Sequence, residues 1–204
     1  TDLSQAFYGC KSLTELDLSR ASTAKVRTFH GMFSGCSGLK RIDLSLLDTS
    51  SARDLSYLFA DCSKLKAVNF AGIKTSTVTD FNHMFSGCSA LVSLDLSSFD
   101  TAAAKNLSYL FFGCSSLASL DLSGLDTSEV ENMPHMFLGC SELTTLDLTS
   151  FDTSMAKSMD YMFYDCSSLK SVSLSQKFSF TGRGITRLCK LPKPLEQKGY
   201  TGLW

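Results

Sequence analysis

The chain has 204 residues, of which 44% are hydrophobic, and a formal net charge of -1, so it is long enough to bury a sizeable core. No apolar run approaches the ~20 residues that a membrane-spanning helix needs, so we expect no membrane insertion by this chain. Residues 177–204 hold six Lys and Arg against one Glu, but the basic residues are scattered, which favours a solvated end over nucleic-acid binding.

Seven of the eight cysteines recur every 26 residues, and this spacing reveals an internal repeat. A Phe stands three residues before each of these cysteines and a Leu three residues after it, with no insertion or deletion. Self-similarity at a fixed period indicates a stacked repeat protein. We therefore predict an α/β solenoid over residues 1–175, a leucine-rich-repeat-like stack of seven 26-residue units. The series is Cys10, Cys36, Cys62, Cys88, Cys114, Cys140 and Cys166.

Each unit is expected to begin with a short helix. A cap at Asn132 places Pro134 in the first helical turn, where its missing N–H does no harm. A Gly or Asp precedes every cysteine of the series and tolerates the left-handed conformation that ends a helix. The pattern therefore predicts a row of short helices on one side of the stack. The cap column contains good N-cap types in every unit: Asp2, Thr28, Asp54, Asp80, Asn106, Asn132 and Ser158.

The helix side carries an aromatic column that we consider as a possible contact row. The alternative interpretation is that these are surface aromatics packed partly against their neighbours. The row consists of Tyr57, His83, Tyr109, His135 and Tyr161.

A short strand is expected after each cysteine. The segment LTTLDLT, residues 143–149, alternates aliphatic and polar residues and is typical of a half-buried strand. Successive units would place these strands in a parallel ladder ~4.8 Å apart on the side opposite the helices.

The outward column of this ladder is the second candidate binding surface, because it is acidic in most units. Like charges at such spacing must be solvated, hydrogen-bonded by neighbouring Ser and Thr, or neutralised by cations or a basic partner. The column consists of Asp17, Asp43, Asn69, Asp95, Asp121 and Asp147.

A turn closes each unit and repeats a threonine. A regular Thr row raises the possibility of ice binding, which requires hydroxyls that project from a flat strand array. This row lies in a turn beside Asp and Ser, so we do not expect that function. The row is Thr23, Thr49, Thr75, Thr101, Thr127 and Thr153.

His135, Cys140 and Asp147 lie within thirteen positions and have the residue types of a cysteine-nucleophile site. The thiol, however, recurs in every unit, whereas His occupies the matching position only twice. This pattern indicates packing, so we predict that the chain is not an enzyme and has no catalytic residues.

Stacked cysteines would lie within reach of disulfide bonds, but the position between the Phe and Leu columns suits buried free thiols. No C-x-x-C pair occurs and the three His lie in different units, so we predict no metal site and no cofactor.

Residues 176–204 break the repeat pattern and are expected to form a basic cap or linker, with Phe178, Phe180 and Ile185 covering the last unit. The first unit has no visible cap. We therefore expect further repeats or a cap upstream in a longer protein.

Units that read LDLSSFDT and NLSYLFFGCSSLASLDLSGLDTS resemble the BspA-like leucine-rich-repeat proteins, a group of bacterial surface proteins, over about residues 1–175. The sequence departs from the general leucine-rich pattern because its cysteine precedes the strand. The resemblance implies an extracellular location at a bacterial cell surface, with signal and anchor outside this chain. It also implies binding to a host or neighbouring-cell protein or glycan. The alternative function is a structural spacer that presents another domain of a larger surface protein.

Overall fold

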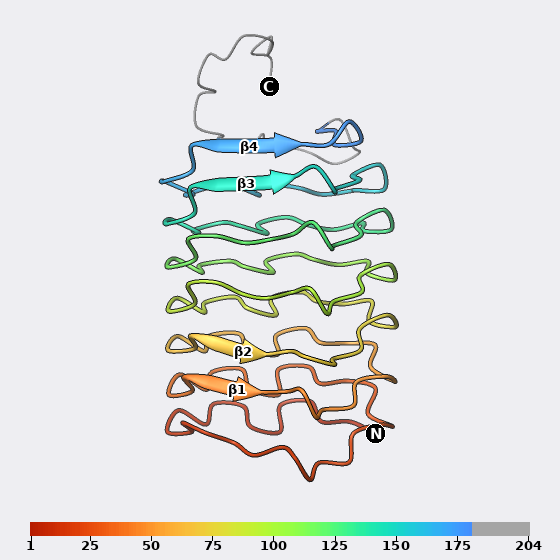
Figure 1. The fold of residues 1–204 in the computed structure, drawn as a ribbon, viewed down its shortest axis with the longest axis vertical. Coiled ribbons are helices and arrows are strands. Elements are labelled where there is room, and N and C mark those ends of the chain that lie inside the picture. Colours follow the sequence, from red (N-terminus) through yellow and green to blue (C-terminus); the bar gives the residue numbers. More distant parts are fainter. Residues whose placement is uncertain (181–204) are drawn as a thin grey trace.

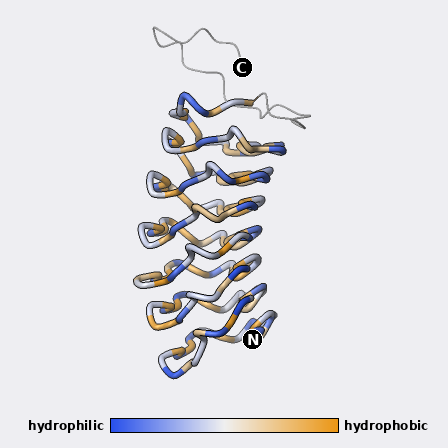
Figure 2. The backbone as a smooth tube through the Cα atoms, turned by 90° about the vertical axis from the view of Figure 1, so that its right-hand side faces the viewer, coloured by the Kyte–Doolittle hydropathy of each residue, from blue (hydrophilic) through white to orange (hydrophobic). Residues whose placement is uncertain are grey.

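The structure is a computed structural model that describes residues 1–180. The chain winds into a stack of similar coils along one axis (Figure 1). Parallel bridges join residues that are 26 positions apart, from Asp2 with Thr28 to Asn132 with Ser158. One sequence period therefore corresponds to one coil. Polar and apolar segments alternate along every coil, and segments of like hydropathy lie above one another (Figure 2).

The strand side contains two separate two-stranded sheets. Strand β1 (Arg41–Asp43) pairs in parallel with β2 (Ala67–Asn69), and β3 (Thr145–Leu148) pairs in parallel with β4 (Ser171–Leu174). The intervening coils follow a similar path, and there Ala118 N–H donates to the carbonyl of Val92 at 3.1 Å. The predicted parallel ladder is therefore present only in part within residues 1–180, because regular strand pairing joins the second coil to the third and the sixth to the seventh.

The opposite side of each coil is not helical, so the predicted short helices were wrong for residues 1–180. A helix needs N–H bonds to the carbonyl four residues earlier. Here the N–H of Phe111 donates to the carbonyl of Met136 in the next coil at 2.9 Å, and the N–H of Cys114 donates to Phe111 at 3.1 Å. Alternate residues thus bond to the next coil or close a local turn. We call this side the turn ribbon; it comprises residues 2–10, 28–36, 54–62, 80–88, 106–114, 132–140 and 158–166.

Two positions of positive φ in each pass explain why the turn ribbon forms. A bond from Leu110 N–H to the Leu107 carbonyl spans Tyr109, which has φ 58°, and a second turn from Phe111 to Cys114 spans Gly113, which has φ 68°. A positive φ at the third residue defines a type II turn. The glycine therefore adopts the left-handed conformation as predicted, but in a turn. Likewise, the Asn106 side-chain oxygen accepts the Ser108 N–H at 3.0 Å and opens a turn where a helix cap was expected.

The core runs without interruption along the axis. Neighbouring Phe rings of the repeat stack with their centroids 5.5 to 6.0 Å apart, from Phe7 through Phe163. The cysteine and leucine columns are buried beside them from Cys36 to Leu169. Each coil thus contributes one layer to a shared core, as expected for a repeat protein.

The threonine row lies inside the stack, where its members from Thr23 to Thr153 are 0–3% exposed. Thr127 is representative: its hydroxyl donates to the carbonyl of Asp152 at 3.0 Å and accepts the N–H of the same residue at 2.9 Å. From Thr49 to Thr153 these hydroxyls tie adjacent coils together. They therefore do not form an ice-binding face.

Phe178 packs against the core at the end of the described chain, and its ring lies 5.1 Å from that of Phe180 in an edge-on contact. Ile185 lies outside the described residues, so the cap over residues 176–204 stays a prediction. Within residues 1–180 there is no helix of the length and hydropathy that crossing a membrane requires.

Candidate binding surfaces

The acidic row of the strand side is held in place by local turns. Each carboxylate accepts the backbone N–H two residues later: Asp95 from Ser97 at 2.9 Å, and Asp147 from Thr149 at 2.9 Å. The same contact, at 2.8 to 3.1 Å, is made by Asp17, Asp43, Asn69 and Asp121. The turn thus fixes one side-chain oxygen of each residue, while the residue itself stays exposed.

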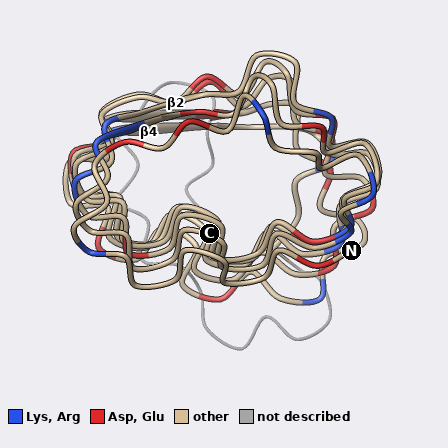
Figure 3. Cartoon of the chain, turned by 90° about the horizontal axis from the view of Figure 1, so that it is seen from below, with Lys and Arg blue, Asp and Glu red and all other residues tan. Residues whose placement is uncertain are grey.

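These contacts also keep the row charged. The hydroxyl and backbone N–H of Ser97 lower the pKa of Asp95, and Thr149 lowers the pKa of Asp147 in the same way. None of the ion pairs among residues 1–180 involves a member of this row. Seen along the axis, the strands and the turn ribbon form opposite sides of a flattened ring, and the charged residues are spread around it (Figure 3). The members of this row are therefore hydrogen-bonded within their own turns.

The aromatic row of the turn ribbon forms one continuous stack. The ring centroids of Tyr57 and His83 lie 4.4 Å apart, followed by His83 and Tyr109 at 4.2 Å, Tyr109 and His135 at 4.4 Å, and His135 and Tyr161 at 5.2 Å. All five residues are half-buried. The structure thus brings together every predicted member, and the ring faces cover one another.

The stack holds its members in an unusual backbone conformation. All five have φ between 55° and 58°, and Gly31 occupies the same column with φ 57°. A left-handed conformation costs roughly 1–2 kcal/mol in a residue with a side chain. Burial lowers the pKa of His83 and His135, so both imidazoles favour the neutral form. The favourable ring contacts offset part of this backbone strain.

A second apolar column beside the stack was missed in the sequence. Its members are small and buried in Ser34, Ala60 and Ser86, but large in the first coil as Tyr8 and in the last three coils as Phe112, Leu138 and Tyr164. Their break with the repeat pattern was the signal that could have identified them. Phe112 lies 5.7 Å from Tyr109, and Tyr164 lies 5.7 Å from Tyr161 at an angle of 84°. We call the combined set the ridge: Tyr109, Phe112, His135, Leu138, Tyr161 and Tyr164.

The Cys/His/Asp set does not come together as a nucleophilic site. Cys140 is fully buried and its Sγ–H donates to the carbonyl of Phe111, while burial raises the thiol pKa. His135 is stacked in the turn ribbon, and Asp147 lies in β3 on the strand side. A cysteine nucleophile needs a lowered pKa and an adjacent base, and Cys140 has neither.

A different Asp/Ser/His contact occurs in the second and third passes of the turn ribbon. The Ser56 hydroxyl donates to Asp54 at 2.6 Å and lies 2.7 Å from Nδ1 of His30. Ser56 is 4% exposed and stands between the other two residues. In a hydrolytic triad the histidine occupies the middle position and takes the serine proton. The contact is therefore explained as a bond between coils.

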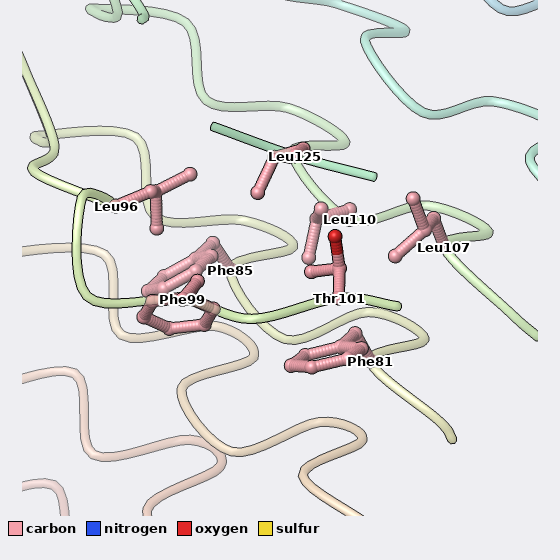
Figure 4. Close-up of a pocket in the computed structure, with 8 residues that line it drawn as sticks. All are labelled: Phe81, Phe85, Leu96, Phe99, Thr101, Leu107, Leu110 and Leu125. Carbon is pink, nitrogen blue, oxygen red and sulfur yellow. The ribbon is translucent and has the colours of Figure 1, made fainter. Parts of the chain in front are cut away.

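An apolar cavity of about 10 Å³ lies inside the stack (Figure 4). It is lined mainly by Phe81, Phe85, Phe99 and Leu110, and the hydroxyl of Thr101 at its edge already donates to the carbonyl of Asp126 at 2.8 Å. A space of this size holds at most a single water and offers no group for a ligand. Residues 1–180 also contain no cluster of three His, Cys, Asp or Glu that could hold a metal ion.

The family model described as "Mycoplasma protein of unknown function, DUF285" matches residues 1–119 and 88–179. No curated protein matches the chain. Similar solved structures include leucine-rich-repeat proteins from T. pallidum (20% identity, TM-score 0.41), Bacteroides ovatus (21%, 0.38) and Eubacterium ventriosum (21%, 0.33). The matches cover 85%, 84% and 77% of this chain, and 61%, 63% and 44% of those chains, respectively. The chain thus spans about three fifths of the length of the first two.

Proposed function

The chain belongs to the family described as "Mycoplasma protein of unknown function, DUF285", a BspA-like leucine-rich-repeat family, and on that premise we propose that it is a non-catalytic binding module of a bacterial cell surface. The resemblance that the repeat motifs indicated is confirmed by this match. In the proposal the module lies outside the cell and recognises a host or neighbouring-cell protein or glycan.

The observation that carries this proposal is the alignment of chemically similar, exposed side chains in rows along a stack whose interior is packed. The interior thiols and most interior Thr hydroxyls are already bonded to neighbouring coils, for example at Cys140 and Thr127. The outer faces instead repeat one kind of group from coil to coil, as with Asp95, Asp121 and Asp147. Such a surface presents many equal contacts to one extended partner, which is how solenoid proteins commonly bind.

A binding screen with the complete chain tests the proposal. The chain would be immobilised and exposed to host matrix proteins and to a glycan array. We expect at least one saturable interaction from these sets. A complete absence of binding in both would count against a binding module and in favour of a spacer.

The contribution of the acidic row is tested by replacing Asp95, Asp121 and Asp147 together by Ser. Serine retains some capacity to bond the N–H of the same turn, so we expect the fold to persist and partner binding to weaken. The matched control replaces Asp100, Asp126 and Asp152 by Ser, since these close comparable turns in a different column. Equal binding by both variants and the unchanged chain would remove the acidic row from the proposal.

The second candidate function is a spacer that holds another domain away from the cell. The uninterrupted Phe stack from Phe7 to Phe163 favours it, because a continuous core stiffens the coils as one rod. The full-length protein discriminates between the two functions. A lectin or enzyme domain at its outer end, with binding confined to that domain, would support the spacer.

A further inference from the structure

We propose that the ridge is a docking surface for a cationic polypeptide segment, rich in Arg or Lys, supplied by another protein. This inference rests on the proposed binding function. It specifies which surface of the stack binds and the chemical class of the partner. The ridge residues are half-buried, except for Tyr164, which is 44% exposed. They form a continuous aromatic and aliphatic strip along the last three passes of the turn ribbon.

The ridge departs from what the fold itself requires. Ser34 and Ser86 occupy the column of Phe112 and Tyr164 in coils that stack equally well, so large side chains are not needed there for packing. Gly31 likewise shows that the left-handed column accepts glycine without backbone strain. The last three coils nevertheless place large side chains in both columns, whereas the first coil pairs Tyr8 with Gln5. Surface aromatics that the core does not need are typical of interaction sites.

The same coils carry the excess of acidic over basic residues in the stack. Residues 106–180 contain nine Asp and Glu against three Lys, whereas residues 28–105 contain seven of each sign. Two of the three lysines, Lys157 and Lys177, already pair with Glu131 and Asp152. Asp160 and Asp165 lie in the turn ribbon next to Tyr161 and Tyr164 in sequence. The aromatic strip and the negative charge therefore coincide in one part of the molecule.

This combination fits a cationic partner. Guanidinium and ammonium groups bind over the faces of aromatic rings, and Phe112 and Tyr164 are the ridge rings that lie outside the face-to-face stack. Nearby carboxylates add Coulomb attraction and hydrogen bonds. The strip runs along the stack axis, so an extended segment can contact several coils in succession. A neutral glycan would gain no Coulomb attraction from the excess carboxylates, whereas a basic segment uses both features.

The test measures binding of an arginine-rich peptide and of a glutamate-rich peptide of equal length to the complete chain. We expect the arginine-rich peptide to bind, more weakly at higher salt, and the glutamate-rich peptide not to bind. The ridge variant carries Phe112→Ser, Leu138→Ser and Tyr164→Ser. Serine is the residue that the chain itself has in the same column at Ser34 and Ser86. The variant keeps the net charge, and we expect about tenfold weaker binding.

A charge-matched pair separates the ridge from general electrostatic attraction. Asp160→Asn with Asp165→Asn should weaken binding more than Asp121→Asn with Asp147→Asn on the strand side. Equal losses in the two pairs, or wild-type affinity in the ridge variant, would overturn the proposal. In a further variant, the Lys and Arg of residues 181–204 are replaced by Gln. If the arginine-rich peptide binds only to that variant, the ridge is the docking surface of the chain's own basic segment, and the proposal of an external partner is overturned. These outcomes do not decide the proposed function. If the ridge variant still binds a partner found in the screen, the chain remains a binding module and the partner lies on another face.

Discussion

The Sγ–H of Cys140 donates to the carbonyl oxygen of Phe111 at 3.2 Å, although the two residues are 29 positions apart in the sequence. The same bond, at 3.0 to 3.2 Å, joins each buried cysteine from Cys36 to Cys166 to the Phe of the preceding coil. The thiols therefore serve as internal donors that satisfy the carbonyls of the turn ribbon. None of the seven cysteines in residues 1–180 forms a disulfide bond.

Thiol labelling should distinguish one cysteine of the series from the other six. Burial raises the pKa of Cys62 and of Cys114 to about 12, so neither forms the reactive thiolate at neutral pH. Cys10 is exposed. In a Cys189→Ser variant we expect Ellman's reagent to label one thiol in the folded protein and six more after addition of denaturant. Fast labelling of several thiols in the folded protein would contradict the buried column.

Truncation of the Phe stack should destabilise the protein strongly. The Phe111 ring is fully buried and lies 5.8 Å from the rings of both Phe85 and Phe137. Phe111→Ala should lower the free energy of unfolding by about 3–5 kcal/mol, measured by urea denaturation. Phe112→Ala is the matched control, because the neighbouring ring is half-buried on the outer surface and its loss should have a much smaller effect. Similar losses from both substitutions would argue against a shared Phe core.

The internal threonine row predicts that Thr→Val lowers stability in one coil but not in another. Thr127→Val leaves the buried N–H and carbonyl of Asp152 without their hydroxyl partner, so stability should fall by about 1–3 kcal/mol. The buried hydroxyl of Thr23 has no hydrogen-bond partner, so Thr23→Val should be neutral or stabilising. Thermal melts of the two variants test this contrast. A destabilised Thr23→Val protein would show that its hydroxyl is bonded in solution.

The pKa of Asp152 should govern part of the stability at low pH. The hydroxyl and N–H of Ser154, followed by Lys177, lower this pKa from 3.8 to about 2. The Asp152 carboxylate takes up its proton less readily in the folded protein than in the unfolded chain. Its contribution to the free energy of unfolding is therefore complete above about pH 4 and is lost as the pH falls to about 2. An NMR titration should show a larger rise in the Asp152 pKa for Ser154→Ala than for Lys177→Gln. The reverse order would contradict the assigned cause.

The histidines of the aromatic stack should make stability rise with pH near neutrality. Burial is the main cause that lowers the pKa of His83 and His135 below 6.5, while Asp61 and Asp160, respectively, act in the opposite direction. The unfolded chain therefore takes up protons first as the pH falls, and stability decreases below about pH 6.5. The double variant His83→Tyr with His135→Tyr introduces the residue that the column already holds at Tyr57, Tyr109 and Tyr161. It should reduce the dependence of the urea midpoint on pH between about pH 5 and pH 7. An unchanged slope would exclude the two histidines as its source.

Both candidate rows could be predicted from the sequence, because a fixed period brings equal positions together whatever the local backbone does. Tyr109 and His135 are neighbours in the stack for this reason, and Asp121 and Asp147 occupy matching turns. The ridge was missed because its column repeats no single residue type: Phe112, Leu138 and Tyr164 follow Ser34, Ala60 and Ser86. A search for identical columns overlooks residues whose significance lies in breaking the pattern.

The sequence by itself determined the period, the buried Phe, Cys and Leu columns, and the positions where the chain turns, because burial and turn chemistry depend on residue type and spacing. Only the tertiary structure decided between a helix and the turn ribbon. Asn106 can cap either one, and Gly113 can end a helix or complete a type II turn. The choice depends on where the backbone N–H groups bond. Stacking supplies the carbonyl of Met136 to Phe111 from the next coil, and that acceptor is absent in an isolated unit.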